Sequence, residues 1–306
     1  MRFVIVGNNF YDEVAAPFTP EPHPHRESYD MAVYNRRAFI KSGIKSSLIA
    51  GTAVTSLHPF AFAAPKRKGW IELFDGKSLQ GWHINPEKIG HGTGGQWEVE
   101  NGVIAGQQDP PGSGNGGILM TDRKFESFVL EIDMKPDWGV CSGLFLRGND
   151  RGQCFQMMVD YHDAGNVGHI YGEGTTGFNT RAFDINGKYD DEKKLIGITT
   201  DKHKNARECG LEYTCTPEAW VKAWKLNGWN TARVEVSGKY PQINTFINGL
   251  KVAKFNGETC DATNYDKEKI HHLLGSSGSI AVQVHGGTGW PNGAKCRWKN
   301  VRIKPM

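Results

Sequence analysis

The sequence predicts an all-β protein built as a sandwich or jelly roll, and three observations carry that prediction. Short runs in which apolar and polar residues alternate recur from Trp70 onward, between turns rich in Gly, Asn, Asp and Pro. Glycine contributes 38 residues and tryptophan nine, whereas long stretches typical of helices are scarce. Asn-Gly pairs at residues 101–102 and 248–249 predict tight hairpin turns. Many short strands joined in this way form two packed antiparallel sheets.

Nine segments carry the strand pattern, in this order: WEVENGVIAG, FVLEIDMK, SGLFLRG, FQMMVDYH, GHIYG, TARVEVSG, INTFING, SIAVQVHG and KNVRIKP. One segment, TPEAWVKAWKLNG, predicts a short helix with Thr216 as N-cap, Pro217 at the first helical position and Gly228 beyond the end. This helix lies in a highly charged segment of about residues 184–226.

Residues 1–63 have the pattern of an export signal rather than of a folded domain. Arg36 and Arg37 precede Phe39, a weakly apolar run follows, and the AFA triplet at residues 61–63 offers a cleavage site. This order resembles a twin-arginine (Tat) signal peptide. The apolar run is shorter than the roughly 20 residues that span a membrane, and no cysteine follows it as a point of lipid attachment.

A signal of this kind would begin at Met31, which makes the true start of translation later than residue 1. We therefore expect the Tat machinery to export a mature chain, residues 64–306, which forms a single jelly-roll catalytic domain. The expected location is the periplasm or the outside of the cell, with no membrane anchor. The formal net charge is +3 and the basic residues are scattered, so we expect no nucleic-acid partner.

The cysteines suggest an oxidising compartment. All six follow residue 63: Cys141, Cys154, Cys209, Cys215, Cys260 and Cys296. An even number permits up to three disulfides, and Cys209 with Cys215, in one loop, is the first pair that we expect. A zinc site near His203 is the alternative, although no C-x-x-C spacing supports it.

Alternation sorts the side chains of each strand between two faces. In FQMMVDYH the core-facing set is Phe155, Met157, Val159 and Tyr161. The opposite face carries Gln156, Asp160 and His162. Asp163 and Glu173 lie at a turn and a loop end, and we do not place them in the site.

Three further strands present polar groups away from their core-facing sets. These groups are Glu131 and Asp133 in FVLEIDM, His169 and Tyr171 in GHIYG, and Gln283 and His285 in SIAVQVH. A solvated outer face is the alternative reading, but such faces usually carry Lys, Glu, Thr and Ser. Short or planar groups such as Gln, Asp and His are suited to binding a ligand in a fixed geometry.

Nearby loops contain tryptophans that suit a sugar ligand. Indole rings stack on the apolar face of a pyranose while amides and carboxylates bind its hydroxyls. We expect Trp138 and Trp290 to contact substrate. We expect Trp70, Trp97, Trp229 and Trp298 to fill the ends of the sandwich.

Eight blocks together resemble the 3-keto-disaccharide hydrolase family over residues 69–306: GWIELFDGKSLQGW, SGLFLRG, FQMMVDYHD, GHIYG, GWNTARVEV, FINGLKVAKF, GSIAVQVHG and RWKNVRIKP. The resemblance implies a concanavalin-like jelly roll, secretion, and action on glycosides whose ring carries a 3-keto group. It also implies a divalent metal, and lyase or hydratase chemistry in some members.

The family pattern is matched at Arg147, Gln156, Asp160, Tyr171, Gln283 and His285. Two departures stand out. Cys141 occupies a position where the family usually has asparagine, and the segment of about residues 184–226 is longer than usual. These departures leave the identity of the substrate open.

A ketone at C3 acidifies the hydrogen on C2, and the C1 oxygen lies β to that ketone, so proton removal can expel the aglycone. The catalytic candidates are His162 or His285 for proton transfer, Arg147 for the oxyanion, and Asp160. The metal candidates are Asp160, His162 and Glu131, which suit Mn, Zn or Fe. The substrate-binding candidates are Gln156, His169, Tyr171, Gln283, Trp138 and Trp290.

Two alternatives stay open. A direct glycoside hydrolase would use two carboxylates, Asp160 with Glu131 or Asp133. A non-catalytic carbohydrate-binding module would need only aromatic platforms, and the fold supports both classes of function.

Overall fold

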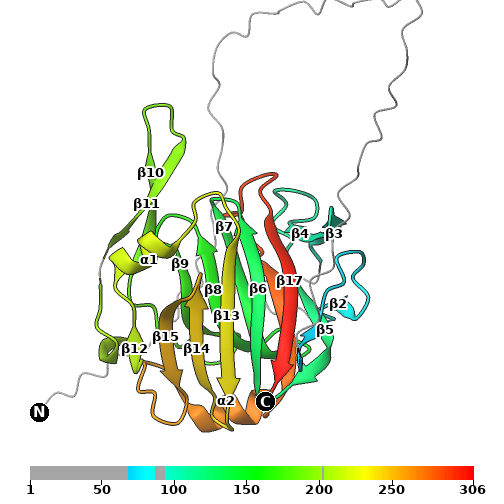
Figure 1. The fold of residues 1–306 in the computed structure, drawn as a ribbon, viewed down its shortest axis with the longest axis vertical. Coiled ribbons are helices and arrows are strands. Elements are labelled where there is room, and N and C mark those ends of the chain that lie inside the picture. Colours follow the sequence, from blue (N-terminus) through cyan, green and yellow to red (C-terminus); the bar gives the residue numbers. More distant parts are fainter. Residues whose placement is uncertain (1–67, 87–93, 202) are drawn as a thin grey trace, which may run out of the picture. The chain divides into compact units, whose positions relative to one another are not determined.

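Two antiparallel β-sheets pack face to face in the computed structural model, which describes residues 68–86, 94–201 and 203–306 (Figure 1). The predicted signal region, residues 1–63, lies outside the described residues. The larger sheet has the order β12-β15-β14-β13-β6-β17-β4-β3, with β1 paired to β17, and the smaller has the order β2-β5-β16-β7-β8-β9. The predicted all-β, concanavalin-like jelly-roll sandwich is therefore confirmed.

The nine strands of the larger sheet are β1 (Ile71–Glu72), β3 (Gln96–Glu100), β4 (Val103–Gln107), β6 (Phe128–Pro136), β12 (Tyr213–Thr214), β13 (Asn230–Ser237), β14 (Gln242–Ile247), β15 (Leu250–Asn256) and β17 (Cys296–Pro305). The six strands of the smaller sheet are β2 (Trp82–Ile84), β5 (Gly117–Phe125), β7 (Val140–Gly148), β8 (Cys154–Tyr161), β9 (Asn166–Glu173) and β16 (Gly278–Val284). A separate hairpin consists of β10 (Asp184–Tyr189) and β11 (Leu195–Asp201).

The main core lies between the two sheets, as the alternation predicts. The predicted inward residues of β8 join one buried cluster with those of β6: Phe155, Met157, Val159, Tyr161, Phe128, Leu130, Ile132 and Met134. None of them is more than 4% exposed. A smaller apolar cluster occupies the other face of the six-stranded sheet and includes Phe145 and Met120. That face is therefore polar only over part of its length.

The two Asn-Gly turns form as predicted. Asn101 and Gly102 join β3 to β4 with φ of 51° and 81°, and Asn248 and Gly249 join β14 to β15 with φ of 50° and 87°. Positive φ at both central residues is the geometry of the type I′ hairpin, which Asn-Gly adopts at little cost.

The predicted helix forms as α1 (Pro217–Ala223), and Thr216 caps it by accepting a hydrogen bond from the backbone N–H of Ala219. The helix ends well before Gly228, because the backbone of Trp224 is already extended, with φ of −72° and ψ of 131°. The indole of Trp224 stacks on Trp220 and donates a hydrogen bond to the hydroxyl of Tyr161. Two helical elements were not predicted: the 3₁₀ turn η1 (Arg207–Cys209), and α2 (Lys267–Leu274), capped by Asp266. No helix in the described part of the chain has the length and apolarity that crossing a membrane requires.

All six cysteines are free thiols, so the expected bond between Cys209 and Cys215 is wrong for this structure. The thiol of Cys209 lies 3.5 Å from the backbone carbonyl of Arg181, to which it donates. Cys215 follows β12 and donates its backbone N–H to Val252 of β15, with its side chain in the core. The side chain of Cys209 is therefore bonded to Arg181, whereas that of Cys215 packs in the core.

The charged segment of residues 184–226 has structure of its own. It contains the β10–β11 hairpin, η1, β12 and α1. Strand β12 extends the larger sheet by pairing with β15, whereas the hairpin projects away from the two sheets (Figure 1).

Candidate functional site

Two adjoining pockets lie on the face of the six-stranded sheet that is turned away from the main core. The first has a volume of about 540 Å³ and is lined by Trp138, Gly139, Cys141, His162, Asp163, His285, Gly286, Thr288, Gly289 and Trp290. The second has a volume of about 250 Å³ and is lined by Cys141, Gln156, Met158, Asp160, Tyr171, Glu173, Asn179, Arg181 and His285. Because both include Cys141 and His285, we describe them as one groove.

The register of the strands brings together the residues at the centre of this groove. Cys141 lies directly opposite Asp160 in the β7–β8 pair. On the other side of β7, the backbone N–H of His285 donates a 3.3 Å hydrogen bond to the carbonyl of Cys141. Three residues that are far apart in the sequence therefore form a row across neighbouring strands, which lie about 4.8 Å apart.

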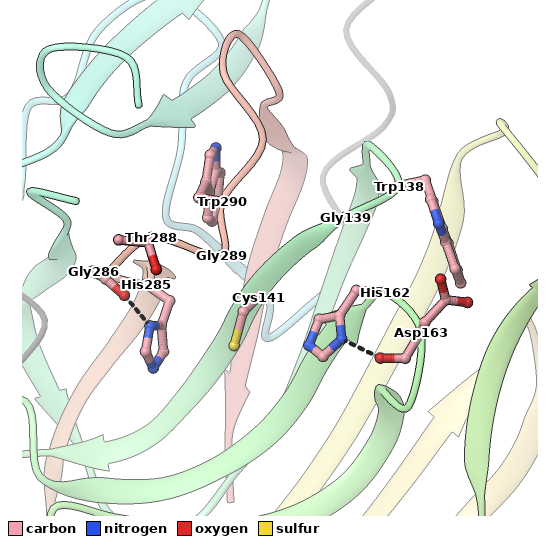
Figure 2. A pocket seen from close by; sticks show the side chains of 10 residues that line it. All are labelled: Trp138, Gly139, Cys141, His162, Asp163, His285, Gly286, Thr288, Gly289 and Trp290. Carbon is pink, nitrogen blue, oxygen red and sulfur yellow. Dashed lines mark hydrogen bonds between the residues drawn. The ribbon is translucent and has the colours of Figure 1, made fainter. Parts of the chain in front are cut away.

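Two imidazoles flank Cys141 (Figure 2). Nδ1 of His162 lies 2.7 Å from the carbonyl oxygen of Asp163, and Nδ1 of His285 makes the same kind of contact with the carbonyl of Gly286. A carbonyl oxygen only accepts, so the Nδ1 atoms carry the protons. In each neutral ring Nε2 is then the basic nitrogen, the form suited to take up a proton or bind a metal.

Asp160 combines burial with close polar neighbours. Its carboxylate accepts a hydrogen bond from the thiol of Cys141, with 3.2 Å between Sγ and Oδ1. Removal from water raises the pKa of Asp160 to about 6, although the Cys141 hydrogen bond, His162 and Arg181 act in the opposite direction. Burial and the Asp160 charge raise the pKa of the Cys141 thiol far above its ordinary value. The pair therefore holds protons more tightly than the free groups would.

Two buried amides support the floor of the second pocket. Nε2 of Gln156 donates to Oε1 of Gln283 at 3.1 Å and to the carbonyl of Ser142 at 3.3 Å. Gly143 leaves the space for this amide, since a Cβ at that position would lie 2.1 Å from Nε2 of Gln156. Tyr171 lies opposite Gln156 in the β8–β9 pair and lines the same pocket. Gln283 is fully buried and lines neither pocket, so its predicted contact with substrate is wrong, and it orients Gln156 from behind.

Both predicted tryptophans line the first pocket. The indole N–H of Trp290 donates to the carbonyl of Ala294 at 2.8 Å, which ties its ring to its own loop. The ring of Trp138 packs edge-on against Tyr161, with 4.8 Å between centroids. Its indole N–H donates to the hydroxyl of Tyr189 in the β10–β11 hairpin at 2.6 Å. Each ring is therefore held by a specific partner at the pocket wall.

Arg147 does not line either pocket, which corrects its assignment to the oxyanion. It lies six residues along β7 from Cys141, about 20 Å at the rise of a strand. Its φ of 54° turns the side chain inward, where it donates to the carbonyls of Glu126 at 2.7 Å and Gly238 at 2.9 Å. Arg147 thus joins two turns at the far end of the sandwich.

Glu131 is also removed from the candidate metal ligands. It belongs to β6 of the larger sheet and faces outward, where its carboxylate binds Arg233 and Arg302. Asp133 shares that face and accepts hydrogen bonds from Thr231 and Asn300. Packed sheets lie about 10 Å apart and these side chains point away from the core, so neither can meet Asp160.

His169 is a structural residue rather than a groove residue. The β8–β9 register shifts between Met157 and Val159, so that both Gly168, with φ of 111°, and His169 lie opposite Met158, and strict alternation does not hold at His169. The buried ring contacts Asn166 Oδ1 at 3.1 Å and the Thr214 hydroxyl at 2.9 Å. Burial lowers the pKa of His169 to about 3, which keeps the ring neutral. The prediction that His169 shares a face with Tyr171 is therefore wrong.

Several groove residues were missed from the sequence. Asp163 and Glu173 were set aside, yet they line the first and second pocket. Alternation from Tyr171 would have placed Glu173 on the correct face. Asn179 and Arg181 lie in a loop, where no periodicity marks a side-chain direction.

The structure suggests a different set of metal ligands. Cys141, Asp160 and His162 each offer one donor atom, and these atoms all lie within 4.8 Å of one another. A sulfur, an oxygen and an imidazole nitrogen at this spacing fit a divalent metal with an open coordination position. The chemistry of the donor set is therefore compatible with the metal that the resemblance implies, with Cys141 in place of Glu131.

Comparison with models of known protein families shows to which family the chain belongs. The model of the 3-keto-alpha-glucoside-1,2-lyase-like domain matches residues 69–304. The chain belongs to this family. Its membership supports a carbohydrate-active, glycosyl hydrolase-like function.

A 3-keto-disaccharide hydrolase of Bacteroides thetaiotaomicron is 35% identical over 83 residues, which is 25% of this chain and 27% of that protein. A crystal structure from Parabacteroides distasonis, described as a candidate glycosyl hydrolase, is 19% identical, covering 78% of this chain and 94% of that one at a TM-score of 0.42. The β-glucanase of Bacillus licheniformis is 12% identical, covering 79% and 100% at a TM-score of 0.37. At these values the solved structures carry no argument about activity.

Proposed function

We propose that the groove binds a 3-keto-glycoside and cleaves its glycosidic bond by elimination, with hydration of the product as a second step. The observation that carries this proposal is the pair of imidazoles on either side of Cys141, each with Nδ1 hydrogen-bonded to a backbone carbonyl. Elimination needs a base and an acid close together, and histidine exchanges protons near neutral pH.

The chemistry places one imidazole on each side of the scissile bond. Nε2 of one ring takes the proton from C2, and the electron pair of that C–H bond forms the C1–C2 double bond. The bond from C1 to the glycosidic oxygen breaks, and the other imidazole, in its protonated form, gives a proton to the departing oxygen. The products are an enone and the free aglycone, and addition of water to the enone completes a hydrolysis.

Other groove residues would orient the sugar. Gln156 and Tyr171 offer hydrogen-bonding groups in the second pocket, and Trp138 offers its partly exposed ring in the first, where the nearly buried Trp290 supplies part of the wall. The guanidinium of Arg181, which is held by Asp184 and by the carbonyl of Ala164, lies at the wall of the second pocket, where its charge would favour the oxyanion that develops at O3. It replaces Arg147 in that role.

Cys141, Asp160 and His162 would hold a divalent metal. When bound there, such an ion would polarise the ketone and lower the cost of removing the C2 proton. In that arrangement His162 is a ligand and no longer exchanges protons, so His285, on the other side of Cys141, would be the base and solvent would protonate the departing oxygen.

A direct hydrolase is the second candidate, because Asp160 and Glu173 line the same pocket. A pKa of about 6 suits Asp160 to the role of general acid. The earlier pairing of Asp160 with Glu131 or Asp133 no longer applies, since those two residues belong to the other sheet.

We also infer export to the periplasm or the outside of the cell by the Tat machinery, on the strength of the Arg36-Arg37 signal pattern. Fusion of residues 31–68 to a reporter that only Tat exports would test it. Export that survives replacement of both arginines by lysine would contradict the inference.

The activity is tested with matched chromogenic substrates. A p-nitrophenyl 3-keto-glucoside and the unoxidised glucoside are each supplied to the purified chain, with and without a chelator, while aglycone release and enone absorbance are followed. We expect turnover of the keto-glycoside alone, and a primary isotope effect when deuterium replaces hydrogen at C2. His162→Ala and His285→Ala should each lower kcat on the order of 10²-fold or more. His83→Ala is the control, because His83 pairs with Asp122 away from the groove.

The outcomes separate the three functions. Turnover of the unoxidised glucoside without an isotope effect would contradict elimination and favour the hydrolase. Binding of sugar without turnover of either substrate would indicate a binding module.

A further inference from the structure

We propose that Cys141 is a metal ligand, and that Cys141, Asp160 and His162 form a sulfur-oxygen-nitrogen centre selective for zinc-like ions over magnesium and calcium. The inference rests on the site of the proposed function and names the metal class that this chain takes. It does not require that the substrate be a 3-keto sugar.

The spacing of the donors fits one small ion. Sγ of Cys141 and Oδ1 of Asp160 are 3.2 Å apart, and the donor atoms of the three residues all lie within 4.8 Å. Zinc bonds of roughly 2.3 Å to sulfur and 2.0 Å to oxygen at a tetrahedral angle separate the two donors by about 3.5 Å. Shifts of the side chains by a few tenths of an ångström would bring sulfur and oxygen to that distance.

The backbone fixes this arrangement. Cys141 and Asp160 are directly opposed residues of paired strands, so the ladder of β7 and β8 sets their separation. His162 lies at the bend directly after β8, two residues beyond Asp160. The strand pair and the bend that follows it thus bring the three donor atoms together.

His162 has the support that metal-bound histidines usually have. Its Nδ1–H donates to the carbonyl oxygen of Asp163 at 2.7 Å. Such a bond fixes the tautomer, orients the ring and leaves Nε2 as the ligand atom. This observation is independent of the position of Cys141.

The sulfur atom of Cys141 determines which class of metal ion the site favours. Magnesium and calcium prefer oxygen ligands, whereas thiolate and imidazole favour zinc and later transition metals. Metal binding displaces the proton of the Cys141 thiol, which now donates to Asp160, and releases it to solvent. Cys141 lines both pockets, so the fourth position of a tetrahedral ion would face the groove.

Cobalt(II) is the direct probe, because thiolate ligation to cobalt gives an intense charge-transfer band in the near ultraviolet. The full chain is stripped with a chelator, titrated with Co²⁺, and then challenged with Zn²⁺ or with a large excess of Mg²⁺. We expect one Co²⁺ per chain with the charge-transfer band, loss of the band on adding one equivalent of Zn²⁺, and no effect of Mg²⁺. No substrate is present, so failure of the proposed reaction leaves this result unaffected.

Two variants complete the test. Cys141→Ser should abolish the band and weaken zinc binding at least 10-fold, and Cys260→Ser is the control, a partly buried cysteine outside the groove. As a measurement that needs no variant, zinc should protect Cys141 from alkylation, read by peptide mass spectrometry. Cobalt binding without the band, a band that survives Cys141→Ser in a folded chain, or alkylation of Cys141 unaffected by zinc would each overturn the proposal.

Discussion

The indole N–H of Trp138 donates a 2.6 Å hydrogen bond to the hydroxyl of Tyr189, which joins the wall of the first pocket to the β10–β11 hairpin. The Tyr189 hydroxyl in turn donates to Oδ2 of Asp163 at 3.3 Å, and Oδ1 of Asp163 accepts the backbone N–H of Gly187 at 2.8 Å. The hairpin therefore contacts two residues of the groove wall, Trp138 and Asp163, which lie beside His162 (Figure 2). An insertion that the sequence left without a role thus helps to build the site.

Tyr189→Phe should raise KM for the keto-glycoside several-fold and change kcat less. The variant removes the acceptor of the Trp138 indole, so the ring loses its fixed position while the imidazoles keep theirs. Steady-state kinetics and intrinsic tryptophan fluorescence would measure the two effects. Tyr213→Phe is the control, because Tyr213 is equally exposed but lies on β12. An unchanged KM would show that the hairpin contact does not position the ring.

Arg147→Lys should destabilise the fold and leave the chemistry intact. Arg147 donates two charge-assisted hydrogen bonds to backbone carbonyls, and lysine cannot make both in the same geometry. The substitution should therefore lower the free energy of unfolding by about 2–3 kcal/mol. Urea unfolding followed by circular dichroism measures the loss, and Arg123→Lys, at an exposed position, is the control. A fall in kcat per folded molecule with unchanged stability would restore Arg147 to the oxyanion role.

Asp160→Asn should stabilise the metal-free protein at neutral pH. The folded pKa of about 6 lies above the ordinary value of 3.8, so the stability that protonated Asp160 contributes is full below pH 3.8 and is lost as the pH rises through 6. The variant does not undergo this loss. The difference in unfolding free energy between the variant and the wild type should therefore be more favourable to the variant above pH 6 than at pH 4, by on the order of 1–2 kcal/mol. Thermal unfolding across this range with chelator present measures it, with the exposed Asp191→Asn as control. A difference that does not change with pH would contradict the raised pKa.

His169→Gln should reduce the acid sensitivity of the fold. The folded pKa of about 3 lies below the ordinary 6.5, so the contribution of neutral His169 is full above pH 6.5 and is lost as the pH falls toward 3. The wild-type protein should therefore lose more stability than the variant between pH 6.5 and pH 4. Urea midpoints at several pH values would show this, with His272→Gln on the exposed face of α2 as control. Parallel pH profiles would mean that His169 does not stay neutral.

The strand pattern predicted the fold well because alternation is a local property that a sandwich core enforces. The core-facing sets of β6 and β8 were correct, as were both Asn-Gly turns and the start of α1. The prediction failed where backbone irregularities break the period. Arg147 has a left-handed φ and His169 follows the bulge at Gly168, so both side chains leave the face that counting assigns to them.

The sequence alone determined the sandwich, the family and the polar character of one strand face. Composition, periodicity and the order of motifs are all properties that can be read from the sequence without knowing which segments pair. Only the tertiary structure decided which polar faces share a sheet. It placed Glu131 and Asp133 on one sheet and Asp160 and His285 on the other, with the core between them. Strand pairing joins segments more than a hundred residues apart, and no local pattern encodes that pairing. Strand pairing also explains the position of Cys141, which departs from the family pattern. It lies at the centre of the groove because Asp160 is opposite it on one side and His285 bonds to its backbone on the other.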